Sequence, residues 1–99
     1  MKGPETRLRK KIVTAVQERY PGIYLRKIHG NQYQNIGVPD ILGCLKSRFF
    51  GMEIKVPGKE RKTTPAQLLE ISKIRRAGGV AGVVTSIEEA FALLEKLNP

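Results

Sequence analysis

The sequence has little that would support a disulfide framework, a cysteine-based metal site or a membrane segment. Its single cysteine among 99 residues, Cys44, excludes an internal disulfide and a cysteine-cluster metal site. Cys44 lies in the apolar run ILGCL, so we expect a buried, unreactive thiol. No apolar run approaches the roughly 20 residues of a membrane-spanning helix. The first residues, MKGPETRLRKK, lack the apolar stretch of a signal peptide, which predicts a cytoplasmic protein.

Acidic residues are also scarce. There are 9 Asp and Glu against 18 Lys and Arg, which gives a formal net charge of +9. Such an excess favours a polyanionic partner, and nucleic acid is the first candidate. A membrane surface is less favoured, because no expected helix has aromatic residues on one face and basic residues on the other.

The hydrophobic pattern predicts one α/β unit without linkers or repeats, a single domain over residues 1–99. Apolar residues at helical or alternating spacing, bounded by Pro, Gly and capping residues, mark seven elements. We expect helices at 4–20, 65–76 and 86–97, and strands at 23–29, 40–46, 49–56 and 80–84. The turn between the second and third strands is placed at Ser47-Arg48. The order αβββαβα, with a helical crossover before the last strand, predicts a mixed central sheet flanked by helices.

Three charged residues lie in otherwise apolar strands: Asp40, Glu53 and Lys55. In a strand over 49–56, Glu53 and Lys55 point to one face, and the apolar side chains point to the other: Phe50, Met52, Ile54 and Val56. Asp40 is expected roughly opposite residue 55, so Asp40 and Glu53 come within reach of one divalent ion. Paired carboxylates suit Mg²⁺ or Mn²⁺, which activate water and neutralise phosphodiester charge. The competing interpretation is a solvated edge strand, with Asp40 capping the turn after Pro39.

The motif GVPD, followed after 12 residues by EIK, resembles the PD-(D/E)xK nuclease signature. The runs NIGVPDILGCL, MEIKVPGKERKTTPAQ and AGGVAGVV resemble more narrowly a VRR-NUC domain, the virus-type replication-repair nuclease module. The resemblance spans nearly the whole chain, and stand-alone domains of this length are typical of phages. It implies a restriction-endonuclease-like core, in keeping with the predicted order of elements.

The resemblance also implies roles for individual residues. Asp40 and Glu53 would be metal ligands, Lys55 the catalytic lysine, and the backbone carbonyl of Ile54 a further metal ligand. Glu5 would complete the metal shell, either directly or through water. Gln67 would be a fourth catalytic residue, after Asp40, Glu53 and Lys55.

Two of these residues have simpler interpretations. Glu5 suits the positive end of the first helix, and Gln67 stands at the capping-box position after Thr64. The only histidine, His29, is interpreted as a strand-end residue satisfied by the backbone rather than as a general base.

Basic and polar residues near the signature are candidate DNA contacts. They would bind phosphates, or stack on bases in the case of tyrosine, without reading sequence. The candidates are Lys27, Asn31, Tyr33, Lys59, Arg61 and Lys62.

The sequence therefore predicts a Mg²⁺- or Mn²⁺-dependent, structure-specific DNA endonuclease. The resemblance implies a homodimer that acts like a Holliday-junction resolvase in phage recombination or repair, in the host cytoplasm. Two alternatives remain open at this point. One is a nuclease for flaps, nicks or linear ends, and the other is a basic DNA-binding module that keeps the fold without cutting.

Overall fold

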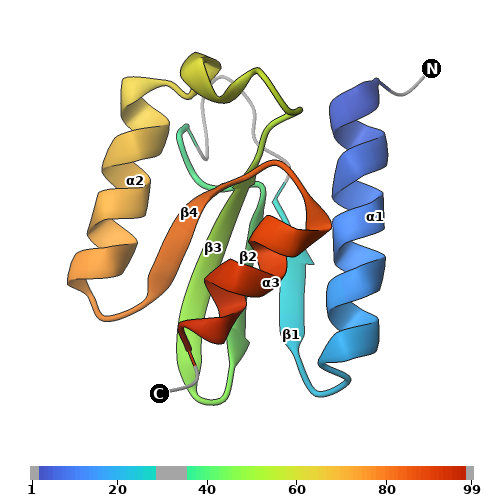
Figure 1. Ribbon diagram of the computed structural model, residues 1–99. Coiled ribbons are helices and arrows are strands. Elements are labelled where there is room, and N and C mark those ends of the chain that lie inside the picture. Colours follow the sequence, from blue (N-terminus) through green and yellow to red (C-terminus); the bar gives the residue numbers. More distant parts are fainter. Residues whose placement is uncertain (1–2, 29–35, 98–99) are drawn as a thin grey trace.

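The computed structural model describes residues 3–28 and 36–97. Three α-helices, four strands and one short 3₁₀ helix, η1, follow one another in the predicted order αβββαβα (Figure 1). The elements are α1 (Pro4–Arg19), β1 (Tyr24–Lys27), β2 (Ile41–Leu45), β3 (Arg48–Ile54), η1 (Glu60–Lys62), α2 (Pro65–Arg76), β4 (Val80–Val84) and α3 (Ile87–Glu95).

The strands form one mixed sheet in the order β1-β2-β3-β4. β1 pairs antiparallel with β2, and β2 antiparallel with β3. β4 pairs parallel with β3 after the crossover through α2, which confirms the predicted mixed sheet. β3 is thus a central strand with a neighbour on each side.

The helices lie in two layers around the sheet (Figure 1). α1 and α3 pack on the face to which Phe50, Met52 and Ile54 point, and these side chains form the core together with apolar residues of both helices. α2 packs on the other face, over β3 and β4. Gly51 allows this approach, because a Cβ there would meet the Ile74 side chain at 2.9 Å. The alternation predicted for the third strand is therefore confirmed.

The hairpin between β2 and β3 differs from the prediction. Lys46 and Ser47, with φ of 53° and 70°, form the turn, and Arg48 already belongs to β3. Positive φ at both central residues matches the twist of a tight hairpin. Ile41 pairs with Met52, so Asp40 comes next to Glu53. The expected pairing of residue 40 with residue 55 is wrong by two residues, because the turn is one residue earlier.

The expectation of a buried Cys44 is also wrong, since Cys44 is exposed. α2 covers β3 and β4, and within residues 3–28 and 36–97 no helix lies over the same face of β1 and β2. We call this area the uncovered sheet face. It holds a shallow cavity of about 230 Å³ lined mainly by apolar residues. These include Tyr24, Leu42, Cys44 and Phe49.

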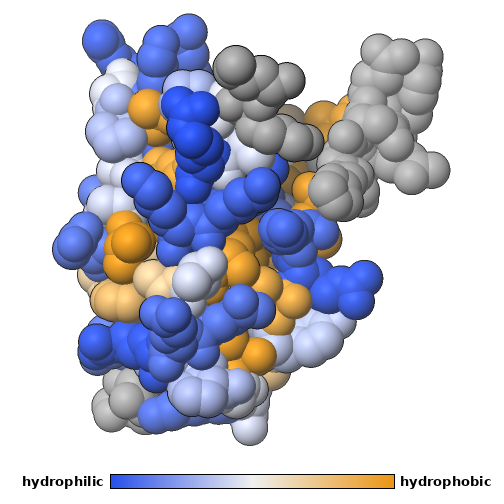
Figure 2. Space-filling view, turned by 90° about the vertical axis from the view of Figure 1, so that its right-hand side faces the viewer, coloured by the Kyte–Doolittle hydropathy of each residue, from blue (hydrophilic) through white to orange (hydrophobic). Residues whose placement is uncertain are grey.

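The surface on the α1 side is largely hydrophilic, with apolar patches between the polar side chains (Figure 2). Arg7, Lys10 and Lys11 of α1 are exposed. Over residues 3–28 and 36–97, none of the helices has the length and apolar character needed to cross a bilayer.

Candidate active site

The three unusual charges meet at the end of the sheet where β3 finishes, the upper end in Figure 1. Glu53 lies in β3, Lys55 directly follows it, and Asp40 directly precedes β2. Glu53 is only 2% exposed. The interpretation as a solvated edge strand is therefore wrong, because β3 is central and α2 lies over this face.

Asp40 is fixed by two hydrogen bonds at the end of the β2–β3 ladder. Its Oδ2 accepts from the backbone N–H of Ile54 at 2.8 Å. Its backbone carbonyl accepts from the N–H of Ile28 at 2.8 Å. The side chain thus makes a bond to β3 just before the first residue of β2, which holds the carboxylate at the sheet end.

The two oxygens of Glu53 have different surroundings. Oε2 accepts from Gln67 Nε2 at 2.9 Å and lies 3.6 Å from Lys55 Nζ. Oε1 is buried and has no hydrogen-bond partner among the described residues. A buried carboxylate oxygen without a partner is costly, so it points to a ligand that this site takes up.

The electrostatics of Glu53 agree with that interpretation. Burial, and after it the negative charge of Asp40, raise the pKa of Glu53 to about 8, while Lys55 opposes the shift. Two nearby carboxylates in a desolvated site resist ionising together unless a cation joins them.

The residues present fit a divalent metal ion. Asp40 and Glu53 offer carboxylate oxygens, the donors that Mg²⁺ and Mn²⁺ prefer, and Glu53 Oε1 is unsatisfied. In the part of the chain that the structure describes, no three His, Cys, Asp or Glu side chains are gathered closely enough to form a closed metal site. The fit thus depends on two carboxylates, and the ligand roles of Ile54 and Glu5 stay predictions.

A cavity of about 390 Å³ opens beside this site, between the first turn of α1 and the segment after β3. We call it the basic cavity, because three lysines line it. Its lining residues are Pro4, Glu5, Lys55, Val56, Lys59 and Lys62. The structure thus brings Glu5 to the same cavity as Lys55, and its negative charge acts weakly on Glu53.

The other predicted DNA contacts are placed differently. Arg61 lies exposed in η1, next to the basic cavity in sequence but outside its lining. Lys27 is exposed at the end of β1 and does not line this cavity either. Asn31, Tyr33 and His29 lie outside the described residues.

Gln67 joins the site to the start of α2. Its side chain forms the capping box with Thr64 and at the same time donates to Glu53. The capping interpretation and the site interpretation of Gln67 are therefore compatible. The sequence pattern T-x-x-Q indicates the cap, but Thr64 itself was not predicted to belong to the site.

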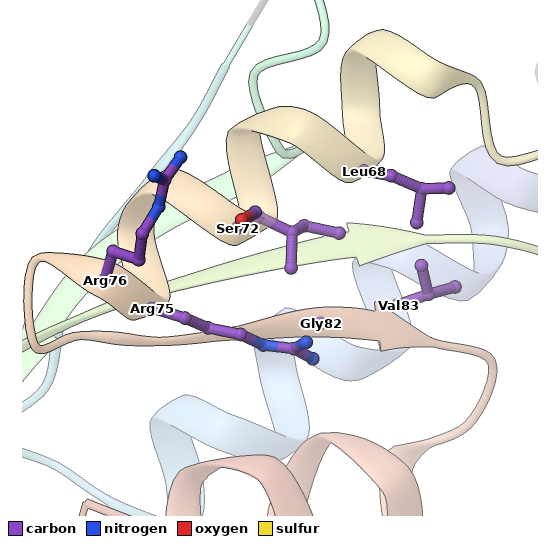
Figure 3. A pocket seen from close by; sticks show the side chains of 7 residues that line it. Leu68, Ser72, Arg75, Arg76, Gly82 and Val83 are labelled. Carbon is purple, nitrogen blue, oxygen red and sulfur yellow. The ribbon is translucent and has the colours of Figure 1, made fainter.

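A further cavity, of about 330 Å³, lies between α2 and β4 (Figure 3). Leu68 of α2 and Val83 of β4 line one end of it, while Arg75 extends along β4 toward Gly82. The Arg75 Nε donates to the carbonyl of Ala81 at 2.9 Å, on the edge strand. None of the predicted site residues lines this cavity.

Comparison with known proteins adds one decisive likeness. No family model and no curated protein sequence matches the chain. Among solved structures, one described as a VRR_NUC domain is similar, with a TM-score of 0.61 and 27% sequence identity. The match covers 87% of this chain and 92% of that one. The chain is similar to a VRR-NUC domain over most of its length and shares its fold. The VRR-NUC fold thus unites the signature residues Asp40, Glu53 and Lys55 with the observed αβββαβα order.

Proposed function

We propose that this VRR-NUC-like domain is a metal-dependent DNA endonuclease that hydrolyses phosphodiester bonds with Mg²⁺ or Mn²⁺. One observation carries the proposal. The buried Glu53 has no partner for Oε1 among the described residues, and it lies close to Asp40 and to a cavity lined by lysines. A pair of carboxylates suited to a metal ion thus lies beside a lysine-lined cavity suited to a phosphate group.

Each residue has a distinct task in this proposal. Asp40 and Glu53 would hold the metal ion, which would supply water activation and charge neutralisation when bound. Lys55 holds a positive charge 3.6 Å from Glu53 Oε2 and also lines the basic cavity. Its ammonium group is placed to stabilise negative charge that develops on a phosphate entering from the cavity. Gln67 keeps Glu53 in one orientation.

The basic cavity supplies the DNA contact in this proposal. Lys59 and Lys62 line the cavity together with Lys55, from the segment that follows β3, and both are exposed to solvent. They would bind backbone phosphates, which fixes the position of the DNA without reading its sequence. Exposed basic residues of α1 extend this charge along the neighbouring surface.

The finer part of the proposal is a homodimeric, junction-resolving enzyme of phage recombination or repair, acting in the host cytoplasm. The resemblance supports the context, and the uncovered sheet face supports the dimer. Tyr24 is 60% exposed and Phe49 45% exposed on that face. A contiguous exposed apolar patch of this kind is typical of a protein–protein contact, and a two-fold dimer suits a two-fold substrate. Replacing Phe49 with Asp should give a monomer in sedimentation analysis.

The deciding experiment is cleavage of a labelled four-way junction and a matched linear duplex with Mg²⁺, Mn²⁺ or EDTA. Asp40→Ala and Lys55→Ala run alongside the wild type. Paired, symmetric cuts that need metal and vanish in both variants support the proposal. Preferred cutting of flaps, nicks or linear ends overturns the junction assignment. Binding without cutting under either metal overturns the enzyme assignment and leaves a DNA-binding module.

A further inference from the structure

The side-chain amide of Gln67 forms hydrogen bonds with two different residues, one through its oxygen and one through its nitrogen. Oε1 accepts from the backbone N–H of Thr64 at 2.9 Å, and Nε2 donates to Glu53 Oε2 at 2.9 Å. A side-chain amide has one acceptor end and one donor end. Once Oε1 is bound at the helix terminus, Nε2 is the end that faces Glu53.

Thr64 completes this arrangement from the other side. Its Oγ1 accepts from the backbone N–H of Gln67 at 3.1 Å, which closes the capping box at the start of α2. Thr64 thus holds both the backbone and the side chain of Gln67. The two bonds depend on each other: without Oγ1 the first turn of α2 loosens, the backbone N–H of residue 64 moves away from Gln67 Oε1, and the amide can turn its oxygen toward the carboxylate of Glu53, where the two oxygens repel.

The Gln67 amide is the hydrogen-bond donor that orients the Glu53 carboxylate. Among the described residues, only Oε2 is held, by Gln67 and the more distant Lys55, while Oε1 is buried without a partner. Holding one oxygen fixes where the other points. The cap of α2 therefore determines where the free oxygen of Glu53 lies.

The choice of Gln at this position supports a role beyond capping. A capping box accepts either Glu or Gln at its third residue. A glutamate here would still accept from Thr64 but would offer no donor to Glu53. Only the amide satisfies both contacts.

We propose that Thr64 is a positioning residue of the active site, which acts through the Gln67 amide to hold Glu53 with Oε1 available to a metal ion. This inference rests on the nuclease function proposed above. It assigns a functional role to the N-cap of α2, which would otherwise be only a stabilising feature of a helix.

The test compares Thr64→Val, which removes Oγ1 with little change in shape, and Thr64→Ser, which keeps the hydroxyl. Ser86→Ala is the matched control, because Ser86 caps α3 by accepting from the N–H of Glu89 at 3.0 Å. Thr64→Val should lower kcat about tenfold with KM unchanged, as expected when a group supporting a metal ligand is removed. Thr64→Ser should restore the activity. Ser86→Ala should lower Tm while leaving kcat unchanged.

Two further measurements do not depend on cleavage. In metal-free protein, NMR should show the Gln67 side-chain amide protons well separated and slow to exchange in wild type and Thr64→Ser. In Thr64→Val, they should move toward the values of a free glutamine. Calorimetry should show weaker Mn²⁺ binding in Thr64→Val and wild-type binding in Thr64→Ser.

The outcomes separate this inference from the proposed function. If Thr64→Val lowers Tm but keeps the amide signals, Mn²⁺ affinity and kcat, Thr64 is only a cap and the inference is overturned. It is also overturned if Thr64→Ser fails to restore them. If the wild type cuts no DNA, the nuclease function fails, and the NMR and Mn²⁺ results still decide how Thr64 acts on Glu53.

Discussion

The carboxylate of Asp40 accepts a hydrogen bond from the backbone N–H of Ile54 at 2.8 Å. A candidate metal ligand therefore also stabilises the end of β3. The two roles can be separated by substitution. Asp40→Asn keeps an oxygen that can accept from Ile54 but removes the charge. Asp40→Ala removes both.

We expect Asp40→Asn to retain stability close to wild type and to lose cleavage. Asp40→Ala should lose cleavage and also about 1–3 kcal/mol of unfolding free energy, because the Ile54 N–H is left without its partner. Urea unfolding and junction cleavage, measured on both variants, check this. Full cleavage by Asp40→Asn would contradict a metal-ligand role for the residue.

The buried state of Glu53 predicts how stability changes with pH. Burial and, after it, the charge of Asp40 raise the pKa of Glu53 from the ordinary 4.5 to about 8 in the folded chain. Between these two values the folded chain keeps a proton on Glu53 that the unfolded chain releases. The contribution of Glu53 to the free energy of unfolding is therefore fully present below about pH 4.5 and is lost as pH rises toward 8. Metal-free protein should therefore unfold at lower urea concentration at pH 8 than at pH 5.

Glu53→Gln is the control for this pH dependence. A neutral amide at position 53 does not titrate, so the decline between pH 5 and pH 8 should be clearly smaller in this variant. Urea midpoints for both proteins across that range are the measurement. Parallel curves for wild type and Glu53→Gln would show that another group causes the decline.

The lysines of the basic cavity predict the salt dependence of DNA binding. Removing one lysine that binds a phosphate should reduce the slope of log affinity against log salt by about 0.9 for duplex DNA. Lys59→Ala and Lys62→Ala should each show this reduction, measured by fluorescence anisotropy over a salt series. Lys96→Ala, at the C-cap of α3 and the opposite end of the molecule, should keep the wild-type slope. Equal slopes in all variants would show that the basic cavity is not part of the DNA-binding surface.

Gly37 predicts a stability effect in the loop that leads to Asp40. Its φ is +80°, and a Cβ there would meet the Ala66 carbonyl oxygen of α2 at 2.6 Å. Gly58 has a similar φ of +88° with open space around it. Gly37→Ala should therefore destabilise by well over the ~1 kcal/mol expected of backbone strain alone, and Gly58→Ala by about that amount. Thermal unfolding of both variants separates close packing from backbone strain.

Local patterns predicted most of the fold because the local signals agree with one another. Thr64 and Pro65 mark the start of α2, and the alternation in β3 correctly assigned Phe50, Met52 and Ile54 to one face. The position of the hairpin turn was missed by one residue. Lys46 and Ser47 adopt positive φ without the Gly or Asn that usually signals it, so the sequence carries no clear mark of that turn.

The remaining differences come from tertiary packing. The run around Cys44 is apolar on both faces, which is typical of a strand covered on both sides, yet α2 covers only β3 and β4. The signature residues could be named from the motif, but the unequal surroundings of the two Glu53 oxygens could not. They depend on Gln67, which is 14 residues away in the chain and meets Glu53 only after α2 packs on the sheet.

The position of Pro4 has a practical consequence for attaching anything to this domain. Pro4 lines the basic cavity, whereas α3 runs down to the opposite end of the molecule (Figure 1). An affinity tag or fluorophore joined ahead of Pro4 would therefore stand at the entrance that we propose for DNA and compete with it. The same label joined beyond Leu97 would leave that entrance clear, so reporters for binding or cleavage belong at the carboxyl end.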